Sequence, residues 1–237
     1  MTTPYKETQN HEVVSIVLCT FNRARLVRRA IESVFAQTYP HWELLIIDDG
    51  STDHSEEKLL PLAKRDRRVM YVRQANKGLA GARNTGIALA SGTYVTFLDS
   101  DDEYRSNHLQ KRVAFMRSHP RVDVLHGGIA PAGPRSKHYV VDLTSPGRKI
   151  HVGKCLASGT IFARRSVLKR VGGFRDVNFG EDFDLMKRLQ KKYAVKRVPW
   201  ATYVYHTETS NRLCDLYEDG GEAAIVRFRK RGSSSRS

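Results

Sequence analysis

Short apolar, β-prone runs alternate with amphipathic segments along the first hundred residues. The apolar runs cover residues 13–19, 42–47, 69–72 and 93–98. Between the first two runs, Val27 and Ile31 recur at helical spacing with arginines around them, which predicts a helix with one buried face. Further helices are expected after a cap at Ser51 or Thr52 and over residues 78–90. Strands that alternate with helices predict right-handed βαβ units and a mostly parallel sheet.

The second half of the chain has a less regular pattern. Helices are predicted around residues 109–116, 165–171 and 181–191, and strands at 122–125, 158–163 and within 195–205. Residues 127–150 are rich in glycine, proline and polar side chains, which favours a variable loop or hairpin. We therefore expect one α/β domain over residues 12–210, between a flexible start (1–11) and a C-terminal extension (211–237) that ends in a basic, disordered tail.

Composition adds a strong positive charge. The chain has 237 residues, of which 40% are hydrophobic, and a formal net charge of +15. Such a charge suits nucleic acid, an anionic membrane surface or anionic small substrates. We interpret most of it as solvated helix faces plus the tail, and contact between the tail and anionic lipid is the alternative. No zinc-finger or RRM signature occurs, so a nucleic-acid partner is not expected.

The sequence also predicts where the protein works. No apolar run approaches the roughly 20 residues that a membrane helix needs, and the first residues are polar. We expect a cytoplasmic protein, which could contact the inner face of the membrane at its periphery. The three cysteines are far apart and form no CxxC pair, so neither a zinc site nor a disulfide framework is indicated.

Four acids follow the last of the N-terminal apolar runs within five residues: Asp99, Asp101, Asp102 and Glu103. A buried strand cannot carry so much charge, so the acids should lie just past its C-terminal end. Ligands bind at that edge of open α/β sheets, and hard carboxylate oxygens select Mg²⁺ or Mn²⁺. The hypothesis is a divalent metal that holds the phosphates of a substrate. The alternative is an acidic turn that caps the next helix.

The polar turns after the first, second and fourth strands should share this edge of the sheet. They contain Thr20, Phe21 and Asn22, then Asp48 and Asp49, then residues 99–102. We expect the three turns to converge on one pocket. An acid after the second strand often meets a nucleotide, which assigns Asp49 to that contact. The alternative is a turn acid that accepts backbone amides.

Three other positions are candidates for chemistry. Arg83 lies in a glycine-broken helix start that is neither a Rossmann nor a Walker A loop, where it could bind a phosphate or lie on the surface beside a close helix–sheet contact. Asp182 begins a helix, where acids are favoured electrostatically and where a general base would stay ionised. His206 follows a β-prone run and is either structural or, near a cation, a third protein ligand.

The order and spacing of these segments resemble the family 2 glycosyltransferases of the GT-A fold over about residues 12–210. The matching segments are 14–22, 45–53 with its DDGSxD turn, 78–86, the DxD motif at 99–101, the GGF turn at 172–174 and the ED motif at 180–182. The resemblance implies a single α/β domain with a Rossmann-like, mostly parallel sheet and helices on both faces. Residues 12–104 would bind the nucleotide sugar, and residues 105–210 would bind the acceptor.

The resemblance also implies a role for each site residue. Thr20 and Phe21 would flank the base and Asp49 would bond to it, with Arg83 near the base or diphosphate. Asp99 would meet the ribose or the metal, Asp101 would bind Mn²⁺ or Mg²⁺, and Asp182 would be the acceptor base. Asn22 and Ser100 lie in the same turns and are assigned to donor binding. His206 is a weaker metal ligand, because the segment at 203–206 lacks the family's arginine.

The implied activity is inverting, metal-dependent transfer from a nucleotide sugar, UDP-linked, to a hydroxyl of a lipid-linked, peptide or small-molecule acceptor. A sugar-1-phosphate nucleotidyltransferase of related architecture is the first alternative. It would need a first loop rich in glycine and basic residues, which the turn at 20–22 is not. A non-catalytic basic protein that binds nucleic acid or membrane is the second. Such a protein has no reason to place acids on three loops, because acids repel phosphates.

Overall fold

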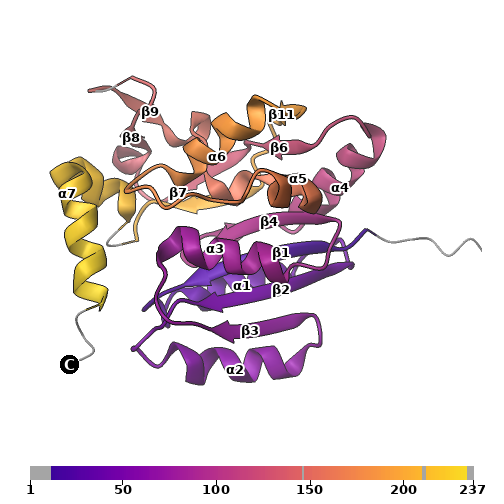
Figure 1. The fold of residues 1–237 in the computed structure, drawn as a ribbon, viewed down its shortest axis with the longest axis horizontal. Coiled ribbons are helices and arrows are strands. Elements are labelled where there is room, and N and C mark those ends of the chain that lie inside the picture. Colours follow the sequence, from indigo (N-terminus) through magenta and orange to yellow (C-terminus); the bar gives the residue numbers. More distant parts are fainter. Residues whose placement is uncertain (1–11, 146, 210–211, 234–237) are drawn as a thin grey trace, which may run out of the picture.

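A seven-stranded sheet in the order β11-β6-β10-β4-β1-β2-β3 forms the centre of the fold. The computed structural model describes residues 12–145, 147–209 and 212–233 (Figure 1). The N-terminal strands pair in parallel and are β1 (Val14–Thr20), β2 (Trp42–Asp48), β3 (Val69–Arg73) and β4 (Tyr94–Asp99). The C-terminal strands are β6 (Val124–His126), β10 (Phe162–Arg164) and β11 (Val195–Arg197), and β10 runs antiparallel to both its neighbours.

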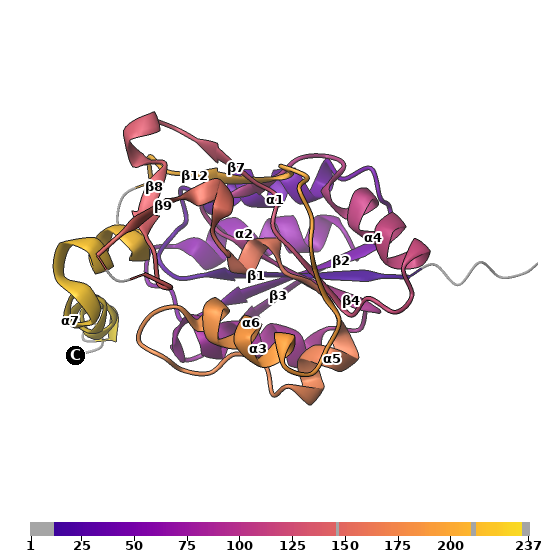
Figure 2. The same cartoon turned by 90° about the horizontal axis from the view of Figure 1, so that it is seen from above.

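Helices cover both faces of this sheet (Figure 2). One layer contains α1 (Val27–Phe35), α2 (Ser55–Arg65) and α4 (His108–Ser118), and the other contains α3 (Gly78–Leu89), α5 (Arg165–Arg170) and α6 (Glu181–Gln190). Ile16 and Leu18 of β1 pack in the first core, and Val17 packs in the second. Burial on both faces explains why the strands are continuous apolar runs rather than alternating ones. The α/β architecture that the sequence predicts is confirmed.

Two small sheets complete the second half. β5 (Glu103–Tyr104), β12 (Tyr203–His206) and β7 (Ile129–Ala132) form one, and β8 (Tyr139–Val141) pairs with β9 (Lys149–His151) in a hairpin. Short 3₁₀ turns occur at Arg135–Lys137, Val152–Lys154 and Ser158–Thr160. The expected hairpin within residues 127–150 is therefore present and ends one residue later.

Glycine permits the close contact between α3 and the sheet that the sequence suggested. A Cβ atom built on Gly86 would lie 2.2 Å from Cγ1 of Val17 in β1. No side chain fits in that space, so the helix can approach the strand this closely only with glycine there.

Several expected boundaries differ from the structure. Residues 158–160 form a 3₁₀ turn instead of starting a strand, and a Cβ on Gly159 would lie 2.0 Å from the Tyr203 ring. The β-prone segment 195–205 splits into β11 and β12, with Pro199 between them. A proline cannot donate a hydrogen bond to a strand ladder, and the two strands belong to different sheets. Helix α2 starts at Ser55, and the carboxylate of Asp53, rather than a cap at position 51 or 52, accepts the backbone N–H of Ser55 at 3.3 Å.

The C-terminal extension is helical where the structure describes it. α7 (Leu213–Ser233) contains a kink at Gly220 and Gly221. Its Tyr217 ring stacks on Phe179 at a centroid distance of 4.3 Å, and Ile225 is fully buried. These tertiary contacts hold the extension against the domain, while the expected disorder of the basic tail stays a prediction. The ends of the chain at 1–11 and 234–237 lie outside the described residues. Within the described residues 12–145, 147–209 and 212–233, no helix combines the length and apolarity that a membrane crossing requires.

Candidate active site

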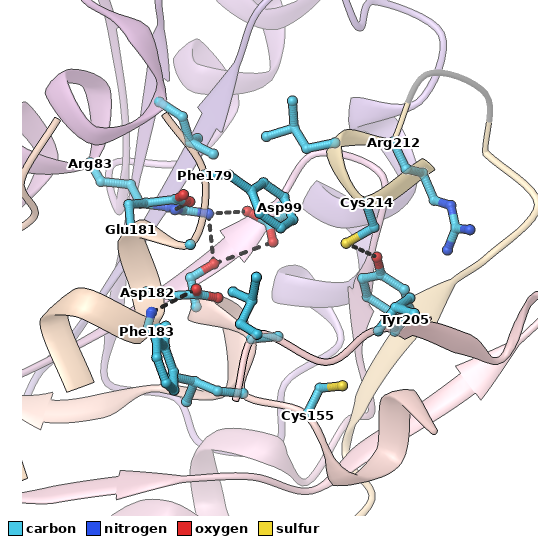
Figure 3. Close-up of a pocket in the computed structure, with 18 of the residues that line it drawn as sticks. Arg83, Asp99, Cys155, Phe179, Glu181, Asp182, Phe183, Tyr205, Arg212 and Cys214 are labelled. Carbon is cyan, nitrogen blue, oxygen red and sulfur yellow. Dashed lines mark hydrogen bonds and ion pairs between the residues drawn. The ribbon is translucent and has the colours of Figure 1, made fainter. Parts of the chain in front are cut away.

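The carboxyl ends of β1, β2 and β4 open into one cavity of about 820 Å³. Eight of the ten residues that the sequence assigns to the site line it, namely Thr20, Phe21, Asp49, Arg83, Asp99, Ser100, Asp101 and Asp182. Figure 3 shows Arg83, Glu181 and Asp182 on one side of the pocket and Tyr205 and Cys214 on the other. The structure thus brings the three polar turns together, while the chemical role of each side chain stays a prediction.

The turn after β1 contributes Thr20 and Phe21 to the cavity wall and Asn22 to the frame behind it. Thr20 is 2% exposed, and among the described residues its hydroxyl has no hydrogen-bond partner. A buried hydroxyl without a partner costs free energy, so a ligand in the cavity would gain by binding it. Asn22 does not line the cavity; its Oδ1 accepts the backbone N–H of Thr52 at 2.7 Å. Asn22 therefore joins two turns instead of facing the ligand.

The two acids after β2 have different surroundings. Asp48 is fully buried and accepts the backbone N–H of Ser51 at 2.8 Å. Asp49 lines the cavity, where its Oδ1 accepts the side-chain amide of Gln74 at 2.7 Å and the backbone N–H of Lys77 at 2.8 Å. Burial raises the pKa of Asp49. Both acids thus accept backbone amides, as the turn interpretation expects. Only Asp49 also lines the cavity, and its contact with a nucleotide stays a prediction.

The first acid of the DxD motif ends β4 instead of lying beyond it. Asp99 accepts a hydrogen bond from Arg83 at 2.8 Å through Oδ1 and one from the Tyr203 hydroxyl at 3.2 Å through Oδ2. Asp101 lines the cavity, and burial, followed by the charge of Asp99, raises its pKa. Two negatively charged carboxylates at one strand end repel one another, and a bound cation would relieve this repulsion.

Asp102 has a structural place that the sequence did not predict. It is 1% exposed and accepts the Tyr203 hydroxyl at 2.5 Å and the backbone N–H of His206 at 2.9 Å. Burial, then the charges of Asp101 and Asp99, raise its pKa well above the ordinary value. Asp102 thus lies past the end of β4, as the sequence predicts, and its hydrogen bonds fasten β12 to that end.

Arg83 is the centre of a buried ion-pair network. Its side chain is 3% exposed, and its terminal nitrogens contact Asp99 at 2.8 Å, Glu181 at 2.5 Å and Ser158 Oγ at 2.6 Å. The surface arginine that the sequence offered as an alternative is thus wrong. Because protein groups occupy both terminal nitrogens, Arg83 holds the DxD strand against the start of α6 and positions the acids on either side.

Asp182 follows Glu181 in the first turn of α6 and faces the cavity. It accepts the backbone N–H of Phe183 at 2.8 Å. Burial, followed by the charge of Glu181, raises the pKa of Asp182 to about 7, against the opposing effect of Arg83. Burial and the charge of Glu181 thus act against the ionised form that a helix start favours, and they bring the pKa of Asp182 close to neutral pH.

His206 is not one of the residues that line the cavity. Its Nδ1 atom lies 2.7 Å from a carboxylate oxygen of Glu208, and its Nε2 atom lies 3.2 Å from one of Glu103. The imidazole therefore faces two acids outside the DxD motif. Among residues 12–145, 147–209 and 212–233, no three His, Cys, Asp or Glu side chains are grouped as an all-protein metal site would need.

The donor set at the end of β4 still fits a divalent ion of the magnesium type. Such ions in phosphate-handling sites are held by one or two protein carboxylates, with phosphate oxygens and waters completing the shell. Asp101 and Asp99 supply carboxylates at one strand end, and both line the cavity. Mn²⁺ or Mg²⁺ is therefore compatible with these residues, with the remaining ligands coming from a substrate.

Three residues of this site were not predicted as parts of it. In the sequence, Glu181 precedes the predicted base, Ser158 begins a predicted strand and Tyr203 lies in a β-prone run. Each contacts Arg83 or Asp99. Their sequence separation from those partners, 75 to 104 residues, leaves no local pattern from which the contacts could have been found.

A family model described as glycosyl transferase family 2 matches residues 15–172 of the chain. One curated relative is the Escherichia coli UDP-Glc:alpha-D-GlcNAc-diphosphoundecaprenol beta-1,3-glucosyltransferase WfgD, 40% identical over 105 residues, which are 44% of this chain and 41% of the relative. The alignments with eight curated relatives span 14% to 48% of those proteins' own length.

Solved structures with the same fold cover nearly the whole chain. S. aureus TarS 1–349 in complex with UDP-GlcNAc has a TM-score of 0.67 at 20% identity, over 94% of this chain and 66% of that one. The mannosyltransferase PcManGT from Pyrobaculum calidifontis, in complex with GDP-Man and Mn²⁺, has a TM-score of 0.67 at 22% identity, over 92% and 60%. At these identities the likeness shows the fold, which is that of GT-A glycosyltransferases.

Proposed function

Because this chain belongs to glycosyl transferase family 2, we propose that it transfers the sugar of a UDP-linked donor to an acceptor hydroxyl with inversion at the anomeric carbon. The observation that carries the proposal is the shared cavity of Asp99, Asp101 and Asp182. It places two acids suited to a cation–diphosphate pair and a third acid suited to a base around one space. The relatives' donors, UDP-Glc and UDP-GlcNAc, support the choice of UDP.

The donor lies along the three turns. Thr20 offers its unpartnered hydroxyl, Phe21 an aromatic face and Asp49 an acceptor for base or ribose groups, all on the cavity wall. Asp101 and Asp99 would hold Mn²⁺ or Mg²⁺, which when bound supplies charge neutralisation for the departing diphosphate. The structure of the mannosyltransferase PcManGT in complex with GDP-Man and Mn²⁺, which has the same fold, supports a metal of this kind.

Asp182 acts as the general base. It accepts the proton of the acceptor hydroxyl while that oxygen attacks the anomeric carbon of the donor sugar. A pKa of about 7 suits this task, because the best base titrates near the working pH. Attack from the Asp182 side, with the diphosphate leaving toward the β4 end, is an in-line displacement and inverts the sugar.

The alternatives have less support. A sugar-1-phosphate nucleotidyltransferase is not favoured by the family match, and a non-catalytic basic protein does not explain the acids around the cavity. Cytoplasmic location and contact with the inner face of the membrane stay predictions, as does a lipid-linked, peptide or small-molecule acceptor. The side chains of residues 228–237, on which the basic-tail hypothesis depends, lie outside the described part of the chain.

Isothermal calorimetry tests the donor site. UDP and UDP-GlcNAc should bind more tightly with Mn²⁺ than without it, and Asp101→Ala should abolish this difference because it removes a ligand of the ion. Asp66→Asn, a partly exposed acid that pairs with Arg68, is the matched control and should behave like the wild type. If the affinity for UDP is the same with and without Mn²⁺ in every variant, the metal has no part in the mechanism.

A further inference from the structure

One face of α1 binds the stretch of chain that follows β4. Ser33 Oγ accepts the backbone N–H of Tyr104 at 3.0 Å. Gln37, just past the end of α1, donates its side-chain amide to the carbonyl oxygen of Arg105 at 3.0 Å. Ser33 and Gln37 are each 8% exposed. Because helix residues four positions apart lie on the same face, the next position of this face toward the DxD motif is residue 29.

Arg29 occupies that position and reaches the DxD motif from α1. Its Nη2 atom donates a hydrogen bond to the backbone carbonyl oxygen of Asp101, and its Nη1 atom lies 3.8 Å from a carboxylate oxygen of Glu208. Hydrogen bonds from an ionised donor are stronger than those between neutral groups. Arg29 therefore ties the turn after β4 to the segment that follows β12.

This contact holds Asp101 in a different way from the acids on either side of it. Asp99 and Asp102 accept hydrogen bonds from Arg83 and Tyr203 through their carboxylates. Arg29 binds the peptide carbonyl of Asp101 instead, so the carboxylate of Asp101 takes no part in the contact. A planar peptide group that is held at its oxygen restricts the backbone next to it. The contact therefore limits the direction in which Asp101 offers its carboxylate.

We propose that Arg29 is a positioning residue for the divalent ion, because it orients Asp101 from behind the wall of the cavity. This inference rests on the proposed function, which assigns Mn²⁺ or Mg²⁺ to Asp101 and Asp99. Arg29 is not one of the residues that line the cavity. It contributes to the ion site only through the backbone of the turn, and it makes no contact with the nucleotide sugar.

Calorimetry of UDP at a series of Mn²⁺ concentrations tests this assignment on the full chain. Arg29→Met keeps an unbranched side chain on α1 and removes both contacts of the guanidinium. We expect the Mn²⁺ concentration that gives half of the increase in UDP affinity to rise by about 10- to 100-fold, as for other groups that orient metal ligands. The UDP affinity without Mn²⁺ should stay that of the wild type, because Arg29 does not touch the nucleotide.

Two further variants separate the position of the guanidinium from its charge. Arg28→Met removes the same charge one residue earlier in α1, where the Arg28 side chain is 80% exposed and pairs with Glu32. This control should keep the Mn²⁺ dependence of the wild type. Arg29→Lys keeps the charge and a donor, but an ammonium group lacks the planar fork of a guanidinium. Its Mn²⁺ dependence should lie between those of the wild type and Arg29→Met.

Two results would overturn the inference and leave the proposed transferase in place. One is a wild-type Mn²⁺ dependence in Arg29→Met. The other is an equal loss of UDP affinity with and without Mn²⁺ in both Arg29 variants, which would mean that Arg29 supports the whole fold and not the ion site. If the UDP affinity of the wild type does not depend on Mn²⁺, the metal of the proposed function is rejected, and the role of Arg29 is rejected with it.

Discussion

Asp182 and Arg83 show how burial changes what a residue type does. At a helix start an aspartate is expected to be ionised, yet burial and the neighbouring Glu181 raise the pKa of Asp182 to about 7. Arg83 is expected to meet a phosphate or solvent, yet it pairs with Glu181 and Asp99 at the base of the cavity. In both cases the surroundings, rather than the residue type, decide the chemistry.

The raised pKa of Asp182 predicts the pH dependence of transfer. A base works only when it is unprotonated, so kcat/KM at saturating Mn²⁺ should be half-maximal near pH 7 and fall about tenfold per pH unit below it. Asp182→Asn should lower kcat by about 10²- to 10⁴-fold, because the amide cannot take the proton. UDP binding should be retained, because Asp182 does not hold the nucleotide.

Initial rates between pH 5.5 and 9, together with calorimetry of UDP, check this prediction. Asp184→Asn, at a residue of the same helix that pairs with Arg188, is the control and should keep the wild-type pH profile. A rate that does not change from pH 7 to pH 5.5 would assign the base to another group.

At the scale of elements, short-range patterns were sufficient for the regular pieces and failed where distant segments meet. The strands β1, β2 and β4 follow directly from short apolar runs, and the helices α1, α3 and α6 from the local pattern of the segments between them. The short β5 and the division of residues 195–205 into β11 and β12 do not, because those strands form only by pairing with partners far along the chain. The N-terminus of α6 also depends on a distant segment, because its N-cap residue Gly180 packs against Leu143 of the hairpin.

Gly180→Ala should destabilise the protein and misplace the base. Gly180 has a φ of 79°, where a side chain costs about 1–2 kcal/mol, and its new Cβ would meet Leu143. Gly172→Ala is the matched control, because Gly172 has a φ of 78° and nothing within 4 Å of a built Cβ. We expect both variants to lose unfolding free energy in urea, and Gly180→Ala to lose more.

Only Gly180→Ala should also lower kcat at saturating donor, because only its new Cβ meets a neighbour, Leu143, that must shift beside the start of α6. Equal stability losses and equal kcat values in the two variants would mean that the hairpin turn does not press on the helix.

At the scale of the whole molecule, segments far apart in the sequence join through buried polar groups as well as through the core. His108 in α4 is fully buried, with Nδ1 3.1 Å from the carbonyl oxygen of Thr202 and its ring stacked on Tyr104 at 3.8 Å. Burial, followed by the charge of Arg112, lowers the pKa of His108 well below its ordinary value of 6.5. The imidazole is therefore neutral in the folded protein.

This lowered pKa predicts a loss of stability in acid. Above pH 6.5 both states leave His108 neutral and it contributes nothing. Below that pH the His108 imidazole binds a proton in the unfolded chain but stays neutral in the folded protein. The contribution of this residue to the unfolding free energy therefore falls by up to about 1.4 kcal/mol per pH unit. Protonation of acids with raised pKa values, such as Asp102, acts in the opposite direction, so the wild-type curve alone does not isolate His108.

His108→Asn isolates the contribution. Urea unfolding of the wild type and the variant at pH 7.5, 6.5 and 5.5 should give a difference that is constant above pH 6.5 and changes in favour of the variant below it, by about 1.4 kcal/mol per unit. Parallel curves over the whole range would show that His108 takes up its proton without unfolding.

The sequence by itself determined the α/β class, the parallel strands and the edge where the acids gather, because periodicity and charge at strand ends are local properties. It also predicted that the turns with Asp49 and Asp101 meet at one cavity, since the loops of parallel strands share an edge; only the family resemblance assigned Asp182 to the same site. Only the tertiary structure decided that Arg83 is buried between Asp99 and Glu181, that Asn22 and Asp102 fasten turns and strands, and that α7 and the β8–β9 hairpin line the same cavity as the acids. Those properties depend on desolvation and on contacts between segments up to 104 residues apart, and neither is encoded in any short stretch of the chain.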